Sequence, residues 1–343
     1  NEDITTIVKK YADDADLGRK IQEPDAYLDF GTKFIKTHEE YISLSSSSVG
    51  EHGMIRTCHN LPKDGGSLGP NDEMFLCIHG LGGTLEQFEP LMRLLDYQHK
   101  KFLALDLPGF GKSDEWEDYP MIKVAQTIHE ISLLLFKRFQ ESQTITIVGH
   151  SAGCYLALHL LSFCCHKYKI EKLVLLSPPK HVIDPLSKKN RWTQYALKAG
   201  YNFPWILDFY RVWIDQRKGL SSSGIQQYFY REGDITNQYR RLWQFHNNVQ
   251  IKSRSLFGYL LGWEAIDWSN LEATLLNSYQ NEVSILVVCG DKDVITPLDD
   301  AKDMLKHFSP IKEKKLIILP ECGHNLTFDC PELLLESLYE GIL

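Results

Sequence analysis

Short apolar runs alternate along most of the chain with longer segments in which apolar residues recur at helical spacing. Alternation of this kind is typical of a mostly parallel sheet with helices on both of its faces. Two earlier runs, at residues 41–45 and 54–59, are predicted to pair as antiparallel strands. The predicted fold class is therefore α/β, with further strands at residues 74–79, 102–105, 144–148, 172–176, 283–289 and 315–319.

The strand pattern stops between residues 179 and 280. This segment holds six of the seven tryptophans of the chain, and its periodicity is that of several helices, so we expect a helical cap. Near the N-terminus, Tyr27, Phe30 and Phe34 share one face of a predicted helix that packs on the body of the protein. The predicted organisation is an N-terminal helical extension (1–40), a first core part (41–178), the cap (179–280) and a second core part (281–343).

Composition and charge narrow the possible function classes. The net charge of −8 argues against a nucleic-acid partner, because phosphate binding depends on clustered positive charge. No apolar run approaches the roughly 18 residues of a membrane span, so the chain is expected to touch a lipid surface without crossing it. Eight scattered cysteines without a C-x-x-C pair do not make a disulfide framework, and they indicate a reducing, intracellular compartment.

The clearest chemical motif is Gly149-His-Ser-Ala-Gly153, which lies between a predicted strand and a predicted helix. A G-x-S-x-G sequence in this setting forms a sharp turn that exposes the serine at the top of the sheet. Glycines suit the turn because its backbone is crowded. Ser151 is therefore the candidate nucleophile, and a turn with a purely structural role is the alternative.

A serine nucleophile needs a base, and the base needs a third group to orient it. Asp291 and Asp293 follow one predicted strand near the end of the chain, and His324 follows the next. Ligands bind at such carboxyl ends of strands in open α/β sheets. We assign His324 as the base and Asp293 as its partner, with Asp291 as the competing carboxylate.

Donors for an oxyanion are expected from the turn Gly80-Leu-Gly-Gly83, which follows the predicted strand that begins at residue 74. The candidate donors are the backbone N–H groups of Leu81 and Ala152. The alternative is a flexible glycine loop without a chemical role.

Motifs for nucleotides and for zinc fail at single positions. Asp106 stands where a phosphate-binding loop ending in Lys112 and Ser113 would need glycine, and Asp114 interrupts the dinucleotide pattern. Leu133 stands where a zinc-binding H-E-x-x-H would need its second histidine. The sequence therefore predicts neither a metal nor an organic cofactor.

Together with these motifs, Asp106-Leu-Pro-Gly-Phe-Gly111 resembles the loop after the fourth strand of the α/β-hydrolase superfamily. The resemblance places Ser151, Asp293 and His324 on the catalytic positions of that family. Fungal members that hydrolyse lipid esters at lipid droplets are similar to this chain at residues 55–61, 85–91, 219–230 and 258–264. The resemblance implies a serine esterase that acts on acylglycerols at a droplet or membrane surface.

The expected activity is hydrolysis of lipid esters through an acyl-enzyme on Ser151. Two alternatives stay open: an acyltransferase or phospholipase with the same residues, and a non-catalytic protein that binds lipid or regulates a lipase on a hydrolase fold. Aromatic rings between Tyr201 and Tyr210 could line an acyl pocket or meet lipid, but for any single ring the prediction is packing of the cap on the core. The expected location is intracellular, at lipid droplets or otherwise in the cytoplasm, and the oligomeric state is left unassigned.

Overall fold

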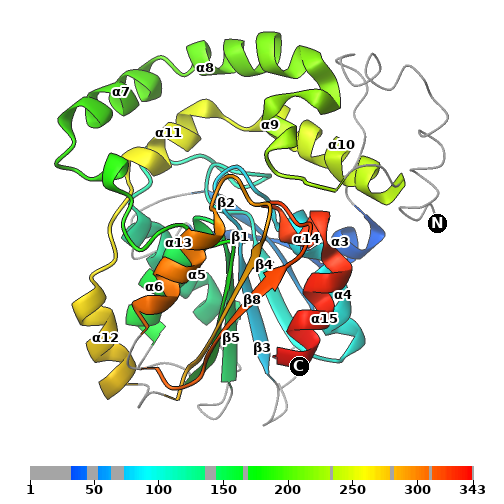
Figure 1. The fold of residues 1–343 in the computed structure, drawn as a ribbon, viewed down its shortest axis with the longest axis vertical. Helices are drawn as coiled ribbons and strands as arrows, with labels where there is room; N and C mark the ends of the chain where they lie inside the picture. The colour runs from blue at the N-terminus through cyan, green and yellow to red at the C-terminus, as the bar shows by residue number, and fades with distance from the viewer. Residues whose placement is uncertain are drawn as a thin grey trace.

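The computed structural model describes residues 32–44, 53–62, 73–135, 144–164, 169–231, 235–278, 282–308 and 311–341. These residues form an eight-stranded sheet in the order β1-β2-β4-β3-β5-β6-β7-β8 (Figure 1). Antiparallel pairing joins β1 (Glu39–Ser43) to β2 (Met54–His59), and β2 to β4 (Lys101–Leu105). The other neighbours pair in parallel, through β3 (Met74–Ile78), β5 (Thr144–His150), β6 (Lys169–Leu176), β7 (Ser284–Gly290) and β8 (Lys314–Leu319).

The predicted α/β class with a mostly parallel sheet is confirmed. Every residue of β3 is buried, because helices cover both faces of the sheet and leave no polar side for alternation. β6 begins at Lys169, three residues before its predicted start. Its first four residues are mostly polar, so they do not continue the apolar run that predicted the strand. Its pairing with β5 also shifts register between Ile145 and Thr146, which interrupts the alternation that would have revealed it.

Helices bury the two faces of the sheet in separate cores. Ile147 and Val148 are neighbours on β5, and their side chains enter opposite cores because residues alternate along a strand. The core around Ile147 lies under α5 (Met121–Leu135), α6 (Gly153–Cys164), α12 (Trp268–Asn277) and α13 (Leu298–Lys306). The core around Val148 lies under α3 (Lys33–His38), η1 (Leu85–Phe88), α4 (Glu89–Tyr97), α14 (Leu326–Asp329) and α15 (Pro331–Gly341).

All described elements between β6 and β7 are helical. In Figure 1, α7 and α8 lie farthest from the sheet with α9, α10 and α11 beneath them, whereas α12 lies beside the sheet. The proposed division of the chain at residues 178 and 280 stays a prediction. Besides α12, these helices are η2 (Asp184–Leu186), α7 (Arg191–Asn202), α8 (Trp205–Phe209), η3 (Tyr210–Asp215), η4 (Gln216–Ser221), α9 (Ser223–Gln226), α10 (Ile235–Gln250) and α11 (Ser253–Leu261).

Only the end of the predicted N-terminal extension is described. Tyr27 and Phe30 lie outside the described residues. Phe34 belongs to α3, and its ring packs on Phe102 of β4 with 5.9 Å between ring centroids. Among the described helices, none combines the length and the apolar character that crossing a bilayer requires.

Two cysteines are paired. Cys322 and Cys330 form a disulfide across the loop between β8 and α15, whereas Cys58, Cys77, Cys154 and Cys289 are buried free thiols. The sequence reading treated the cysteines as scattered and missed this pair, because the two residues are eight positions apart and match no short motif. The fold brings them together when the chain turns back after β8.

A buried cation joins β2 to the loops at the carboxyl edge of the sheet. Arg56 is 1% exposed, and its guanidinium contacts Glu39 at 2.7 Å, Glu86 at 2.6 Å and Asp106 at 3.1 Å. The Asp106 carboxylate also accepts the backbone N–H of Leu85 at 2.8 Å. Arg56 and Asp106 therefore fix the chain that follows the glycine-rich turn at residues 80–83.

Replacing Arg56 with methionine should lower the free energy of unfolding by about 3–5 kcal/mol, because it leaves buried carboxylates without their cation. Urea denaturation measures the change. The control is Lys302→Met, which removes an ion pair to Asp299 in which the two side chains are 48% and 88% exposed, and should cost less than about 1 kcal/mol. Equal losses in the two variants would contradict a special role for the buried cluster.

Candidate active site

Ser151 lies on the turn between β5 and α6 with φ of +53°, in the left-handed region that side chains rarely adopt. Its N–H donates to the carbonyl of Leu176 on the neighbouring strand at 2.9 Å. The flanking glycines are required: a Cβ on Gly149 would lie 2.7 Å from the Gly153 carbonyl oxygen, and one on Gly153 would lie 2.3 Å from that of Ile78. The turn holds Ser151, half-buried, at the wall of a cavity.

Asp293 and His324 meet beside this turn. Asp293 follows β7 and His324 follows β8, and the His324 Nδ1 lies 2.8 Å from the Asp293 Oδ2. Both residues are buried. Asp291 is exposed instead, where it pairs with Lys292 at 3.2 Å. The structure thus brings Asp293, and not Asp291, to the histidine.

The Asp293 carboxylate is held in its ionised form. Burial alone raises the pKa of this group, but the hydrogen bond and charge of His324 and the N–H of Thr296 outweigh burial and leave the pKa below its usual value. The N–H groups of Ile295 and Thr296 both donate to Oδ1 at 2.9 Å. Because an ionised carboxylate only accepts, His324 donates its Nδ1–H, which leaves the Nε2 lone pair free to act as a base.

Two further histidines shape the site, and the sequence analysis gave neither a role. The Nε2–H of His150 donates to the His324 carbonyl at 3.0 Å. His79 accepts the N–H of Leu107 at Nε2 (2.9 Å) and donates from Nδ1 to the Gly80 carbonyl (2.7 Å). Both could have been suspected from their places, since His150 precedes Ser151 and His79 precedes the glycine-rich turn.

Burial keeps both histidines neutral. It lowers the pKa of His79 to about 4, and burial together with the charge of His324 lowers the pKa of His150 to about 3. Histidines in the unfolded chain take up protons near pH 6.5. The unfolded state therefore gains protons first as the pH falls, and folding stability decreases from about pH 6.5 down to about pH 4.

Replacing His79 with glutamine should flatten this decline by about 0.7 kcal/mol between about pH 7 and 6 and by about 1.2 kcal/mol between about pH 6 and 5, as the unfolded histidine takes up one proton. Urea unfolding of the parent and of His79→Gln at about pH 7, 6 and 5 measures the two slopes. The other titrating groups are common to both proteins and cancel in the difference. If the free energy of unfolding falls with pH equally in the parent and in His79→Gln, the fold does not hold His79 neutral.

The predicted oxyanion donors lie at the same place. Leu81 and Ala152 line the cavity with Ser151, and a Cβ on Gly80 would lie 2.8 Å from the Ser151 Cβ. Within the described part of the chain, the N–H groups of Leu81 and Ala152 have no hydrogen-bond acceptor. Two unpaired donors beside a serine suit a developing negative charge.

The cavity has a volume of about 530 Å³, within the range of small-molecule sites. His324 and Ser151 line it together. Among the described residues no hydrogen bond joins them, as is common before a substrate is bound. Its apolar lining comes mainly from the segment after β6 and from α11, and includes Val182, Ile183, Leu186, Leu256, Leu260 and Trp263.

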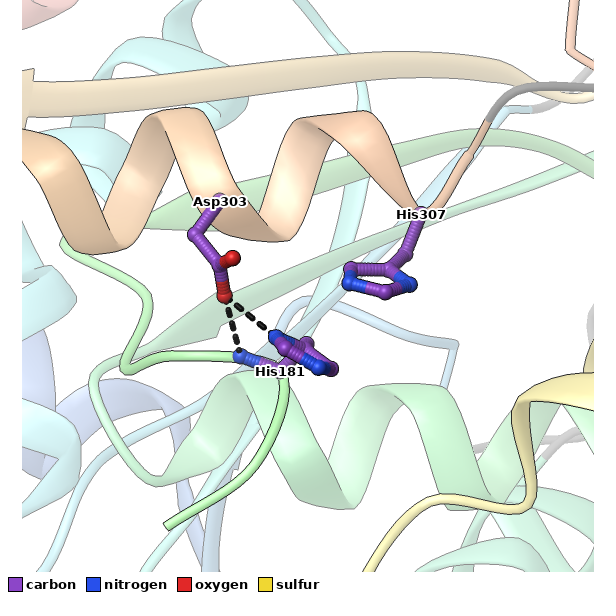
Figure 2. Close-up of side chains that lie close together, drawn as sticks. All are labelled: His181, Asp303 and His307. Carbon is purple, nitrogen blue, oxygen red and sulfur yellow. Dashed lines mark hydrogen bonds and ion pairs between the residues drawn. The ribbon is translucent and has the colours of Figure 1, made fainter.

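Two groups of side chains in the described residues offer three metal-ligand atoms each. In the first, Asp329 lies beside the Cys322–Cys330 disulfide, and its carboxylate already accepts the N–H of Gly323 at 2.6 Å and of Tyr230 at 2.9 Å. This group positions the loop that carries the histidine of the site. The second group contains His181, Asp303 and His307 (Figure 2). None of these three lines the cavity, although their chain neighbours Lys180 and Val182 do.

Comparisons with known proteins give a consistent result. Residues 73–331 match the model of the alpha/beta hydrolase fold family. The chain is 42% identical to Lipid droplet hydrolase 1 of Saccharomyces cerevisiae over 99% of its own length and 93% of that protein. It is 24% identical to the AB hydrolase superfamily protein YisY of Bacillus subtilis, over 86% of this chain and 93% of the relative.

Solved structures share the fold at lower identity. A thermophilic esterase from Thermogutta terrifontis is 14% identical, with a TM-score of 0.63, and the match covers 88% of this chain and 98% of the esterase. The bromoperoxidase from Bacillus anthracis is 18% identical, with a TM-score of 0.61 and the same coverage of both chains. At these identities the structures show a shared fold and do not specify a substrate.

Proposed function

Because the chain belongs to the alpha/beta hydrolase fold family, we propose that it is a serine carboxylester hydrolase with Ser151, His324 and Asp293 as its catalytic triad. One observation carries the proposal: the buried hydrogen bond from His324 to Asp293, next to the left-handed turn of Ser151. A buried histidine oriented by a carboxylate beside a strained serine is the arrangement that activates a hydroxyl.

The reaction proceeds in two halves. The Nε2 of His324 accepts the Ser151 hydroxyl proton as Oγ attacks the ester carbonyl, and the N–H groups of Leu81 and Ala152 stabilise the oxyanion. Collapse of this intermediate breaks the bond to the alcohol, which leaves with the proton from His324. A water molecule then attacks the acyl-enzyme by the same route and releases the carboxylic acid. Asp293 stabilises the imidazolium form of His324 in both halves.

The proposed substrates are lipid esters, with acylglycerols as the class. The apolar wall formed by the segment after β6 and by α11 suits an acyl chain better than a charged substrate. The similarity to Lipid droplet hydrolase 1 extends over nearly the whole chain, and this supports action at the surface of lipid droplets.

Initial rates on an ester series from short to long acyl chains, in solution and emulsified, test the proposal. A preference for emulsified long chains, lost in Ser151→Ala, is the expected result. A preference for soluble short chains would make the protein a general esterase, and near-blank rates in both proteins would favour the non-catalytic alternative. Product analysis with an added acceptor alcohol, and with phosphatidylcholine as substrate, separates the acyltransferase and the phospholipase.

A further inference from the structure

A group of exposed apolar side chains belongs to α7, α8 and η3. In Figure 1, α7 and α8 are the described helices farthest from the sheet. Exposed fractions run from 49% for Tyr210 to 86% for Trp192. Single exposed apolar residues are ordinary, but a dense group marks an interaction surface. We call this group the aromatic band, and its members are Trp192, Tyr195, Phe203, Trp205, Ile206, Phe209, Tyr210, Trp213 and Ile214.

The inner side of the same helices is anchored to the protein, so the outward orientation of the band is fixed. The Tyr201 hydroxyl donates to the Glu117 carbonyl, and the Ser253 hydroxyl donates to Asp208 at 2.6 Å. Leu197 is the buried residue of α7. The band is therefore a built surface of the cap.

The sequence left three roles open for these rings: packing of the cap on the core, lining of an acyl pocket and contact with lipid. The position of the band distinguishes among these roles. The packing prediction is wrong for Phe203, Trp205, Phe209 and Tyr210, because each is about half exposed or more. No residue of the band lines the cavity beside Ser151, so these rings do not form the acyl pocket. Contact with a lipid surface is therefore the role that remains for these rings.

Charge at the edge of the band complements an anionic lipid surface. Residues 188–218 contain seven basic and two acidic residues, in a chain whose net charge is −8. Asp215 is buried and accepts the N–H groups of Ser223 and Gly224, so it presents no charge to solvent. Lys198 and Arg217 are exposed. Exposed aromatic rings flanked by basic side chains are the composition of segments that lie in a lipid interface.

We propose that the aromatic band is the surface by which this protein docks on a phospholipid layer that carries anionic headgroups. The inference deepens the proposed function, because it names the partner that would bring a lipid ester to Ser151. The band also begins close to the site in sequence: the cavity wall includes residues 180 and 182–186, and Trp192 is six residues further on. Docking through the band would therefore place this wall near the lipid.

Vesicle sedimentation with the full chain tests the docking surface. The probes are vesicles of phosphatidylcholine alone and of phosphatidylcholine mixed with phosphatidylserine. We expect preferential binding to the mixed vesicles and at least a tenfold loss of affinity in the variant Trp205→Ser/Phe209→Ser/Trp213→Ser, since ~1.4 kcal/mol of lost burial is tenfold. The matched control is Tyr97→Ser/Tyr339→Ser, which removes rings that are 77% and 54% exposed on other helices and should bind like the parent.

The outcomes separate docking from catalysis. Equal vesicle binding by the band variant and the control, or no binding by the parent, would overturn the docking surface even if soluble esters are hydrolysed. Vesicle binding through the band by a parent that hydrolyses no ester would leave the docking surface standing and overturn the proposed function. If the parent forms dimers in solution that the band variant abolishes, and neither protein binds vesicles, the band belongs to an interface with a second copy of the chain instead.

A second and independent inference concerns the three side chains in Figure 2. Asp303 and His307 lie one turn apart at the end of α13, and His181 reaches them from the segment after β6. His181 Nδ1 lies 2.5 Å from Asp303 Oδ2, and the two imidazole rings are stacked with centroids 3.7 Å apart. One ligand atom from each side chain lies within 4.8 Å of the other two. Trp268 supports the group, since its indole N–H donates to the His181 carbonyl at 3.2 Å.

We infer that His181, Asp303 and His307 form a zinc site. Two imidazole nitrogens and a carboxylate oxygen are ligands that Zn²⁺ prefers, and water completes its tetrahedral shell. The ion replaces the Nδ1 proton of His181, which moves to Nε2, and the His307 ring turns out of its stacked position to direct a nitrogen at the ion. Lys180 and Asp300 line the cavity next to this group, so bound zinc would fasten the cavity wall to α13 without entering the reaction.

Isothermal titration of the untagged full chain with zinc chloride tests the site. One zinc per chain is expected, with the affinity lowered about tenfold or more in His307→Ala and in Asp303→Ala, as each removes a ligand. His99→Asn, far from α13 in sequence, is the control and should bind like the parent. Absence of binding, or binding that the two ligand variants leave unchanged, would overturn the site; a thermal shift on adding zinc to the parent alone would support it.

Discussion

Replacing Ser151 with alanine should reduce ester hydrolysis by about 10⁴–10⁶-fold, because the variant has no atom that can form the acyl-enzyme. The fold should persist, since the side chain is half-buried and accepts no structural hydrogen bond among the described residues. Initial rates on one soluble ester at saturating concentration measure the loss. A fluorophosphonate probe that labels the parent but not the variant identifies the residue that is modified.

The rates left in the single and double variants of Ser151 and His324 show whether the two residues act in the same step. His324→Ala should lose a similar amount, and the double variant should lose little more than either single one, because the two residues act as a unit. Additive losses would mean that the serine and the histidine serve different steps. A Ser151→Ala variant that keeps most of its activity would remove the serine mechanism altogether.

The fold and the positions of the site residues could be predicted from local patterns in the sequence. The strand, turn and helix around Ser151 occupy one continuous stretch, and the glycines there are required by contacts of 2.3 and 2.7 Å that any side chain would make. Asp293 and His324 were predicted because each follows a strand, and parallel strands bring their carboxyl ends to one edge. Adjacent strands β7 and β8 then make the 2.8 Å hydrogen bond possible.

Contacts between distant parts of the chain were not predictable in this way. His150 donates to a carbonyl 174 residues away, and no local pattern marks that pair. The packing prediction for the rings of the aromatic band was wrong for a different reason. Apolar residues at helical spacing look the same whether they face a protein core or a lipid layer, so only the fold shows which side of α7 and α8 is exposed.

Replacing Asp293 with asparagine should lower the turnover rate by about 10⁴-fold while changing substrate affinity little. The amide has nearly the shape of the carboxylate, but its NH₂ group can donate to Nδ1 and so favour the tautomer of His324 whose Nε2 carries the proton. The base would then be unable to accept the Ser151 proton. Turnover rates and Michaelis constants on a soluble ester separate this effect from a loss of binding.

The sequence offers a matched control two residues earlier, in the carboxylate that competed for this role. Asp291→Asn removes the same charge from the same loop, but Asp291 is exposed and pairs with Lys292, so its turnover rate should stay within about twofold of the parent. Equal losses in the two variants would point to the loop as a whole and not to the carboxylate at 293. A large loss in Asp291→Asn alone would reassign the partner of His324, because a carboxylate can orient the imidazole only by accepting its Nδ1–H.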